Sequence, residues 1–258
     1  MRASKIGDRE IHILSGNGMV IAGININYYR PWIYPLCSPS GINILREFPP
    51  DHGFHNGFFF GHNPVVCKEK KFNFWGAPPF RSKDDELQEN LGRITAQIKD
   101  VAESRDRVDV LLIAEWGSID GTTILLEHRY LSVQIAQAVS TIETESVLTN
   151  VTDDVVTLLQ SKFSGHTLRL NNQIDIAKIA ALPNYLCSMN AKTITGLEID
   201  LIGYQVCGIG YELEFYLEKS AHFLSRNYGF LSANPFFNQS KSLKPGEKTV
   251  IYTKINLT

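Results

Sequence analysis

The chain has 258 residues, of which 43% are hydrophobic and 20% are charged, as is ordinary for a globular protein with a substantial core. Its formal net charge is −2, so no global field favours nucleic acid or an anionic membrane as a partner. No stretch is long and apolar enough to span a bilayer, and the first residues lack the apolar segment of a secretory signal. Four cysteines without a CxxC pair predict buried thiols in a reducing compartment, so we expect a soluble, cytoplasmic protein.

Alternation of apolar and polar residues with a period of two dominates the chain. It predicts β-strands at 10–14, 19–29, 109–116, 122–133, 146–151, 154–159, 194–201, 211–218 and 249–256. Turn signals separate several of them: Gly16-Asn17-Gly18, Asp120-Gly121 and Pro245-Gly246. Many strands with one polar face each predict an all-β fold of antiparallel sheets, stacked into a sandwich or closed around a cleft.

Only two short segments, 84–91 and 132–139, are compatible with helices, so we expect few short helices. No internal repeat, low-complexity tract or Ser/Gly linker divides the chain, and residues 1–258 are therefore predicted to form a single domain. The segment 76–92 has paired prolines followed by a charged run, which predicts a long loop over one end of the sheets. Long loops in compact β domains often cover a site.

Three of the seven histidines fall within a stretch punctuated by Gly and Pro, at 49–62. His52 and His55 are three positions apart in a loop, so they can converge on one point. If 58–62 is extended, His62 lies one strand length from the turn, on the face of Phe58 and Phe60. Imidazoles with a carboxylate suit zinc, manganese, iron or nickel. The alternative is that these histidines only bond backbone carbonyls in a tight loop.

Two further observations concern the neighbours of these imidazoles. Asp51 could cap the turn or orient an adjacent imidazole, and the sequence does not separate the two roles. His12 and His166 have no supporting context, and we expect both at the surface.

In the strand around 122–131, alternation places Glu127 and Arg129 on one face and His128 on the other. Only one of these sets can line a cavity. A carboxylate in a mostly apolar cavity suits a general base or a metal ligand. The alternative for Glu127 and Arg129 is a cross-strand ion pair at the surface.

Motifs at both ends of the chain carry a family resemblance: Arg30-Pro31-Trp32-Ile33-Tyr34-Pro35-Leu36, Ser38-Pro39-Ser40-Gly41, Pro50-Asp51-His52, Gly61-His62, Arg226-Asn227-Tyr228-Gly229, Ala233-Asn234-Pro235 and Leu243-Lys244-Pro245-Gly246-Glu247. They resemble the PmoA-like family (DUF6807), with its "RPY..PL.TP.G", "DHPHHRG" and "WFGH" patterns. The resemblance implies a β-supersandwich like that of aldose mutarotases, and activity on sugars or oxidised sugar derivatives. The family pattern also has a Glu followed by an Arg, which favours Glu127 and Arg129 facing inward.

The sequence departs from the family pattern at the histidine-rich turn. The family's "DHPHHRG" stands here as Asp51-His52-Gly53-Phe54-His55-Asn56-Gly57, with Phe54 in place of a histidine and Asn56 in place of the arginine. Loss of the arginine removes a cation with five donors, and Phe54 adds apolar area. We therefore hypothesise a substrate less polar than a simple sugar, such as a specialised metabolite, contacted by Phe54 and Asn56.

The remaining candidates are side chains near the motifs. Arg30 and Arg226 could bind a substrate carboxylate or hydroxyls, although ordinary structural pairing is an equal alternative. Tyr34 could stack on a substrate, or pack at the rim as Trp32 and Trp75 could. His222 could be a further metal ligand or acid, or else a solvent-exposed histidine.

Together these residues predict a lyase or isomerase that abstracts a proton next to a carbonyl or hemiacetal carbon. His52, His55 or Glu127 would act as acid or base, and a divalent metal of unknown identity on His52, His55, His62 and His222, or an arginine, would stabilise the oxyanion. The alternatives are a metal-dependent oxygenase and a non-catalytic carbohydrate-binding protein. No dinucleotide motif is present, so we expect no nucleotide or flavin. The expected partner is a small-molecule substrate, bound by a monomer or homodimer.

Overall fold

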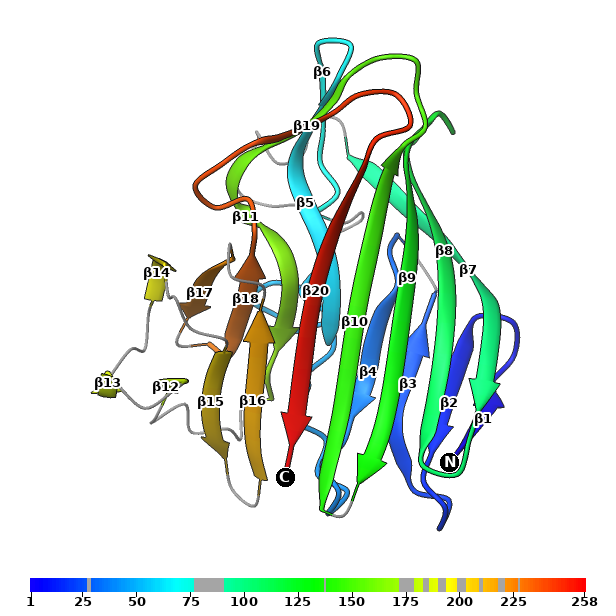
Figure 1. Cartoon of the computed structure of the whole chain (residues 1–258), viewed down its shortest axis with the longest axis vertical. Coiled ribbons are helices and arrows are strands. Elements are labelled where there is room, and N and C mark those ends of the chain that lie inside the picture. Colours follow the sequence, from blue (N-terminus) through cyan, green and yellow to red (C-terminus); the bar gives the residue numbers. More distant parts are fainter. Residues whose placement is uncertain are drawn as a thin grey trace.

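The computed structural model describes residues 1–26, 29–76, 91–136, 138–171, 179–182, 186–189, 194–198, 203–208, 211–217, 221–226 and 228–258. In these residues the chain forms two antiparallel sheets of eleven and nine strands, and they contain no helix (Figure 1). The predicted all-β, antiparallel sandwich is therefore confirmed. Within the same residues, no helix has the length and hydropathy needed to cross a bilayer.

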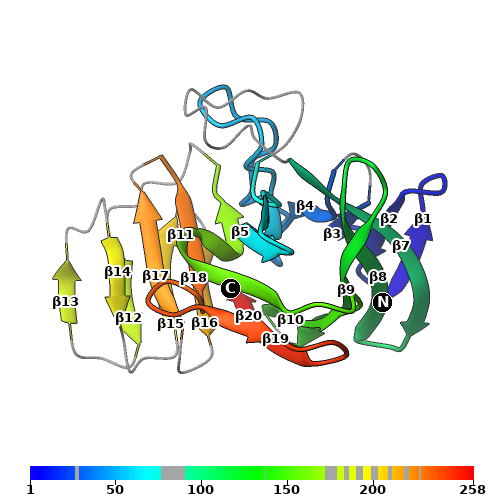
Figure 2. The ribbon, with the colours of Figure 1, turned by 90° about the horizontal axis from the view of Figure 1, so that it is seen from above.

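The two sheets stack as layers, which Figure 2 shows from above. The first sheet has the strand order β1 (Arg2–Lys5), β2 (Glu10–Leu14), β3 (Val20–Asn25), β4 (Trp32–Leu36), β5 (Phe58–Cys67), β11 (Val156–Arg169), β18 (Phe230–Asn234), β17 (His222–Arg226), β14 (Ile194–Glu198), with β6 (Lys70–Phe72) on β5 and β19 (Lys241–Leu243) on β11. The second has the order β13 (Leu186–Met189), β12 (Ile179–Leu182), β15 (Gly203–Gly208), β16 (Tyr211–Leu217), β20 (Lys248–Leu257), β10 (Val139–Asn150), β9 (Thr123–Ala136), β8 (Arg107–Ser118), β7 (Gly92–Glu103).

Each predicted strand overlaps an observed one, and the predicted turns at 16–18 and 120–121 join β2 to β3 and β8 to β9. The predicted helix at 132–139 is wrong. Leu131 and Val133 are buried while the residues between and after them are not, which is a period of two, and pairing of β9 with β10 continues to Val139 and Ala136. Nearly all of the other predicted helix, at 84–91, and of the predicted loop at 76–92 lies outside the described residues.

The main core lies between the sheets, and β5 separates it from a second apolar cluster. Phe58 and Phe60 point toward the second sheet, where the ring of Phe60 lies 5.2 Å from that of Trp116 on β8. Phe59 points the opposite way because successive residues of a strand face opposite sides. It joins an aromatic cluster on the outer face of the first sheet: Trp32, Phe59, Trp75, Leu224 and Phe230. The first sheet is therefore apolar on both faces around β5.

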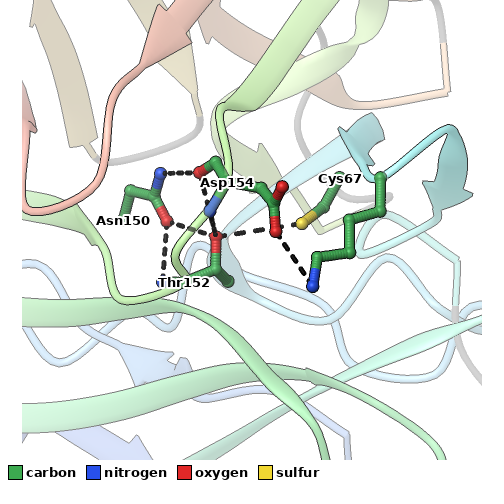
Figure 3. A network of polar contacts seen from close by, with 5 residues as sticks. Cys67, Asn150, Thr152 and Asp154 are labelled. Atoms are coloured by element: carbon green, nitrogen blue, oxygen red, sulfur yellow. Dashed lines mark hydrogen bonds and ion pairs between the residues drawn. The ribbon is translucent and has the colours of Figure 1, made fainter.

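A polar network holds the segment that carries the chain from β10 in one sheet to β11 in the other (Figure 3). The side-chain amide of Asn150 donates to the carbonyls of Asp154, at 2.7 Å, and Leu243, at 2.9 Å. Its oxygen accepts from the backbone and hydroxyl of Thr152, each at 2.9 Å. The buried amide thus satisfies backbone groups that have no ladder partner at the crossing.

Candidate functional site

Charged and aromatic side chains gather on the outer face of the first sheet, and we call them the outer-face cluster: Arg30, Asp51, His52, His55, Arg169 and Tyr228. The loop before β5 supplies Asp51, His52 and His55. Arg169 ends β11, where alternation turns it away from the core that its neighbour Leu168 enters. Tyr228 precedes β18. Arg30 lies between β3 and β4, so four segments that are distant in the sequence meet in this cluster.

Four rings of this region form a column. Tyr228 stacks on His52 with ring centroids 4.9 Å apart, and His52 stacks on His55 at 4.8 Å with the rings 2° from parallel. His55 in turn lies 5.9 Å from Phe59. The loop thus brings His52 and His55 together, as the sequence predicted, but the two rings stack face to face and do not converge on one point.

A guanidinium group lies at each end of the column. The Cζ of Arg169 is 4.5 Å from the ring centroid of Tyr228, and that of Arg30 is 3.6 Å from the ring of Phe59. At these distances the cations are attracted by the ring faces. The column is therefore enclosed by positive charge at both ends.

Asp51 connects the solvent-facing imidazole to the arginine. His52 Nδ1 lies 3.0 Å from Asp51 Oδ2, and Arg169 Nη2 donates to both carboxylate oxygens at 2.7 and 2.6 Å. Burial raises the pKa of Asp51, but hydrogen bonds from His52 and Arg169 and the guanidinium charge outweigh it and leave the pKa below its ordinary value. The ionised carboxylate accepts from Nδ1, so Nε2 is the nitrogen of His52 that can take a proton from a ligand.

The inner end of the cluster is buried, and no carboxylate among the described residues pairs with it. Burial holds the pKa of His55 well below its ordinary value, and the charges of His52, Arg30 and Arg169 lower it further, so this imidazole is neutral. Arg30 donates from Nη1 to the carbonyl of Trp75 at 2.7 Å and from Nη2 to that of Phe54. Burial lowers the pKa of Arg30 to about 10, which still leaves it protonated at neutral pH.

Glu127 and Arg129 face inward, as predicted, and form an ion pair between the sheets. Arg129 donates to Glu127 from Nε at 2.7 Å and from Nη2 at 3.0 Å, and Trp116 Nε1 donates to the same carboxylate at 2.8 Å. Trp116 packs on the inward ring of Phe60, whereas His55 packs on the outward ring of Phe59. Glu127 therefore lies on the opposite side of β5 from His52 and His55, and the three predicted catalytic residues do not meet in one site.

The other predicted metal ligands lie apart from His52 and His55. His62 faces the core, where its Nδ1 lies 2.6 Å from Ser164 Oγ and burial lowers its pKa to about 3. His222 is also buried, with Nε2 2.8 Å from Asn238 Nδ2. In the part of the chain that the structure describes, no three His, Cys, Asp or Glu side chains form a group suited to a metal. A bound metal stays a prediction.

His166 corrects one sequence prediction. It was expected at the surface, but it is buried between the sheets, where Nε2 lies 3.1 Å from Ser146 Oγ and Nδ1 3.0 Å from Thr253 Oγ1. Burial is the main cause that keeps its pKa well below the ordinary value. Two hydroxyls of the second sheet thus satisfy both ring nitrogens of a neutral imidazole.

The other predicted substrate-binding residues, Phe54, Asn56, Tyr34 and Arg226, differ in their surroundings. Phe54 lies in the site, with its ring 4.6 Å from His55 in an edge contact. Asn56 is buried and engaged with the chain itself, since it accepts from the Phe48 backbone at 2.8 Å and donates to the Tyr29 hydroxyl at 3.3 Å. Tyr34 and Arg226 are half-buried: Tyr34 packs beside Trp32, and Arg226 donates to the carbonyl of Ser225 at 2.7 Å.

Two residues of the cluster were not predicted from sequence: Arg169 and Tyr228. The strand expected at 154–159 ended too early, because β11 continues to 169 across a register shift between Leu158 and Phe163. Tyr228 lay within a quoted motif, but nothing in its surroundings indicated contact with His52.

The chain is a two-sheet, antiparallel sandwich protein with a cluster of charged and aromatic side chains on one outer face. Residues 24–196 match the family of unknown function DUF6807, and the chain belongs to this family. No curated protein matches the chain by sequence.

Solved structures with a similar fold include two GH36 α-galactosidases of Geobacillus stearothermophilus. AgaA is 11% identical over 96% of this chain with a TM-score of 0.54, and AgaB is 8% identical over 99% with a TM-score of 0.52. The chain spans 40% of the length of each enzyme. A galactose mutarotase-like protein from Lactobacillus casei is 6% identical, with both chains fully covered and a TM-score of 0.48. At these identities the likeness concerns the fold alone.

Proposed function

We propose that this protein is a carbohydrate-processing enzyme of the isomerase or lyase type, with His52 as its acid–base group. The observation that carries the proposal is the Asp51–His52 pair, whose side chains are 40% and 36% exposed. His55, Phe59 and both arginines beside the pair are buried, and Tyr228 is half-buried. Asp51 orients the imidazole through Nδ1, so His52 Nε2 is the nitrogen that removes and returns a proton.

The chemistry is proton abstraction next to a carbonyl or hemiacetal carbon. As the proton moves to His52, negative charge grows on the substrate oxygen, and we assign its stabilisation to Arg169, which shares the Asp51 carboxylate with His52. Glu127, which was expected to share this work, keeps both carboxylate oxygens on Arg129 and Trp116 and is assigned to the structure of the core.

A carbohydrate-type substrate is supported by two lines. The α-galactosidases that share the sandwich are carbohydrate enzymes by name. The site itself combines an aromatic wall with charged donors, as sugar and sugar-derivative sites require: rings for the apolar face and polar groups for the hydroxyls. Phe54, at the edge of His55, contributes to that wall.

Solvent deuterium exchange tests the proposal without knowledge of the natural substrate. Wild-type protein is incubated in D₂O with a panel of aldoses, ketoses, keto-sugars and uronates, and NMR follows deuterium incorporation and anomer interconversion. We expect exchange on at least one sugar class, and a rate lower by roughly 10²–10⁴-fold in His52→Ala, the usual contribution of a positioned acid–base group.

His12→Ala is the matched control, because His12 also pairs with a carboxylate, Glu10, at 2.5 Å, but on β2. Its exchange rate is expected to equal that of the wild type. Wild-type protein that exchanges no member of the panel, or a His52→Ala variant with undiminished rates, would contradict the proposal.

A further inference from the structure

The outer-face cluster holds more positive than negative charge. Arg30 and Arg169 are both buried. Among the described residues, Asp51 is the one carboxylate that bonds to either guanidinium, and it bonds to Arg169. Arg30 bonds to two main-chain carbonyls instead. A buried cation without an anionic partner is costly, so its presence needs a compensating charge from elsewhere.

Hydrogen-bond donors of the same cluster are also unfilled. Arg169 donates to Asp51 from Nη2 alone, and its Nε and Nη1 are buried with no partner among the described residues. Arg30 Nε and His55 Nδ1 are in the same condition. Guanidinium groups bind carboxylates most strongly through two parallel donors, and that mode is unused at Arg169.

We propose that the substrate carries a carboxylate, which binds the guanidinium of Arg169 beside Asp51 in the field of Arg30. This inference rests on the proposed function and names the substrate class of that site. The side chain of Asp51 is 40% exposed and that of Arg169 only 1%, so the proposed carboxylate approaches at Asp51 and shares Arg169 with it. A neutral sugar offers only uncharged acceptors, which do not compensate the charge of a buried guanidinium.

Asp51 then has two opposed effects. It holds His52 in the orientation needed for proton transfer, but its charge repels a substrate carboxylate that approaches the same arginine. Asp51→Asn keeps the shape and removes the charge. It is therefore expected to tighten binding of the carboxylate while slowing turnover, a combination that loss of folding does not produce.

The experiment compares sugars that differ only in the carboxylate. Glucuronate and glucose, and galacturonate and galactose, are titrated into wild-type protein and into Asp51→Asn, Arg169→Gln and Arg107→Gln by calorimetry, with NaCl varied. The control, Arg107, is an exposed arginine that pairs with Asp109 at 2.7 Å on β8. Trp75, whose ring is 5.9 Å from that of His55, provides a fluorescence signal for the same titrations.

In wild-type protein a uronate is expected to bind at least about tenfold more tightly than its parent sugar. The preference should fall as NaCl is raised. Arg169→Gln should abolish it, Asp51→Asn should strengthen uronate binding several-fold, and Arg107→Gln should leave it unchanged.

Equal affinity for uronates and parent sugars, or no binding of either, overturns the inference. So does weaker uronate binding in Asp51→Asn, which keeps the test decisive if Arg169→Gln fails to fold. Failure of the proposed function looks different: uronates bind with the expected preference, yet no sugar exchanges deuterium. If neutral sugars exchange deuterium but uronates bind no more tightly than their parent sugars, the inference of a carboxylate substrate is overturned and the proposed function stands.

Discussion

Two buried arginines, on opposite sides of β5, show how differently one protein can treat the same charge. Between the sheets, Arg129 binds both oxygens of Glu127, and Trp116 completes the carboxylate. On the outer face, Arg169 reaches its carboxylate through one nitrogen, and that carboxylate is partly exposed. In the inner pair the charges compensate each other, whereas in the outer pair Nε and Nη1 of Arg169 have no hydrogen-bond partner among the described residues.

This difference in hydrogen bonding distinguishes a structural arginine from one that we assign to ligand binding. An ion pair whose members satisfy each other has no capacity for a ligand, so its burial serves the packing of the core. A buried cation whose donors stay unfilled is costly to the fold and is explained most simply by a ligand. By this criterion Glu127, which the sequence suggested as a catalytic residue, is assigned to the core, and Arg169 is assigned to the proposed site.

Glu127→Gln is the change with the largest expected effect on stability. It leaves the charge of Arg129 buried without an anion, and the loss in the free energy of unfolding should be about 3–5 kcal/mol, measured by urea denaturation. Glu115→Gln, on an exposed position of β8, should change little. A loss below about 1 kcal/mol for Glu127→Gln would show that the inner pair is not the structural element described here.

Acid should destabilise the inner region through its neutral imidazoles. Above pH 6.5 His62 is neutral in both the folded and unfolded states and contributes no pH dependence. Below pH 6.5 the unfolded chain binds a proton that the folded state, with a pKa of about 3, refuses. His62 alone should cost about 2 kcal/mol of unfolding free energy between pH 7 and pH 5, and the loss should continue toward pH 3.

Urea denaturation at the two pH values measures this loss. His62→Gln should lose about 2 kcal/mol less than the wild type on going from pH 7 to pH 5. His12→Gln, a change at a partly exposed histidine, should follow the wild type. An identical loss in His62→Gln and wild type would mean that His62 is protonated in the folded protein.

Arg169→Met should have the smallest effect and sharpens the contrast between the two arginines. Methionine removes a cation with unfilled donors, and the Asp51 left behind is solvated, so the free energy of unfolding should stay within about 1 kcal/mol of the wild type. Arg129→Met is the matched change and should cost about 3–5 kcal/mol, because it strands buried Glu127. Similar losses in the two variants would remove the distinction drawn here.

The periodic part of the fold could be predicted from the sequence. Alternation located the strands and placed Glu127 and Arg129 on one face, the family resemblance favoured the inward face for them, and the spacing of His52 and His55 in a turn brought their rings together. These features depend only on near neighbours in the chain. The same local pattern gave the wrong helix at 132–139, because a short run of apolar residues does not distinguish a helix from the end of a long strand.

The composition of the site could not be predicted, because it depends on which face of the sheet the histidine-rich loop covers. Alternation assigns faces within one strand but does not say which face is the outer one. Phe59 and Phe60 are equally apolar, yet one belongs to the site and the other to the core. Arg169 required the register of β11 beyond its irregularity, and His166 required two hydroxyls from the opposite sheet.

The arrangement of β5 also constrains how its sequence can change length. Insertion or deletion of one residue before Phe59 would exchange the two sides of the strand, so that His62 would turn outward and Gly61 would enter the interior. Gly61 fits its present side because a Cβ there would lie 2.8 Å from the carbonyl oxygen of Phe74 and 3.2 Å from Arg30. Length variation in this strand should therefore be tolerated only in steps of two residues, which keep each side chain on the side of the sheet where its packing partners lie.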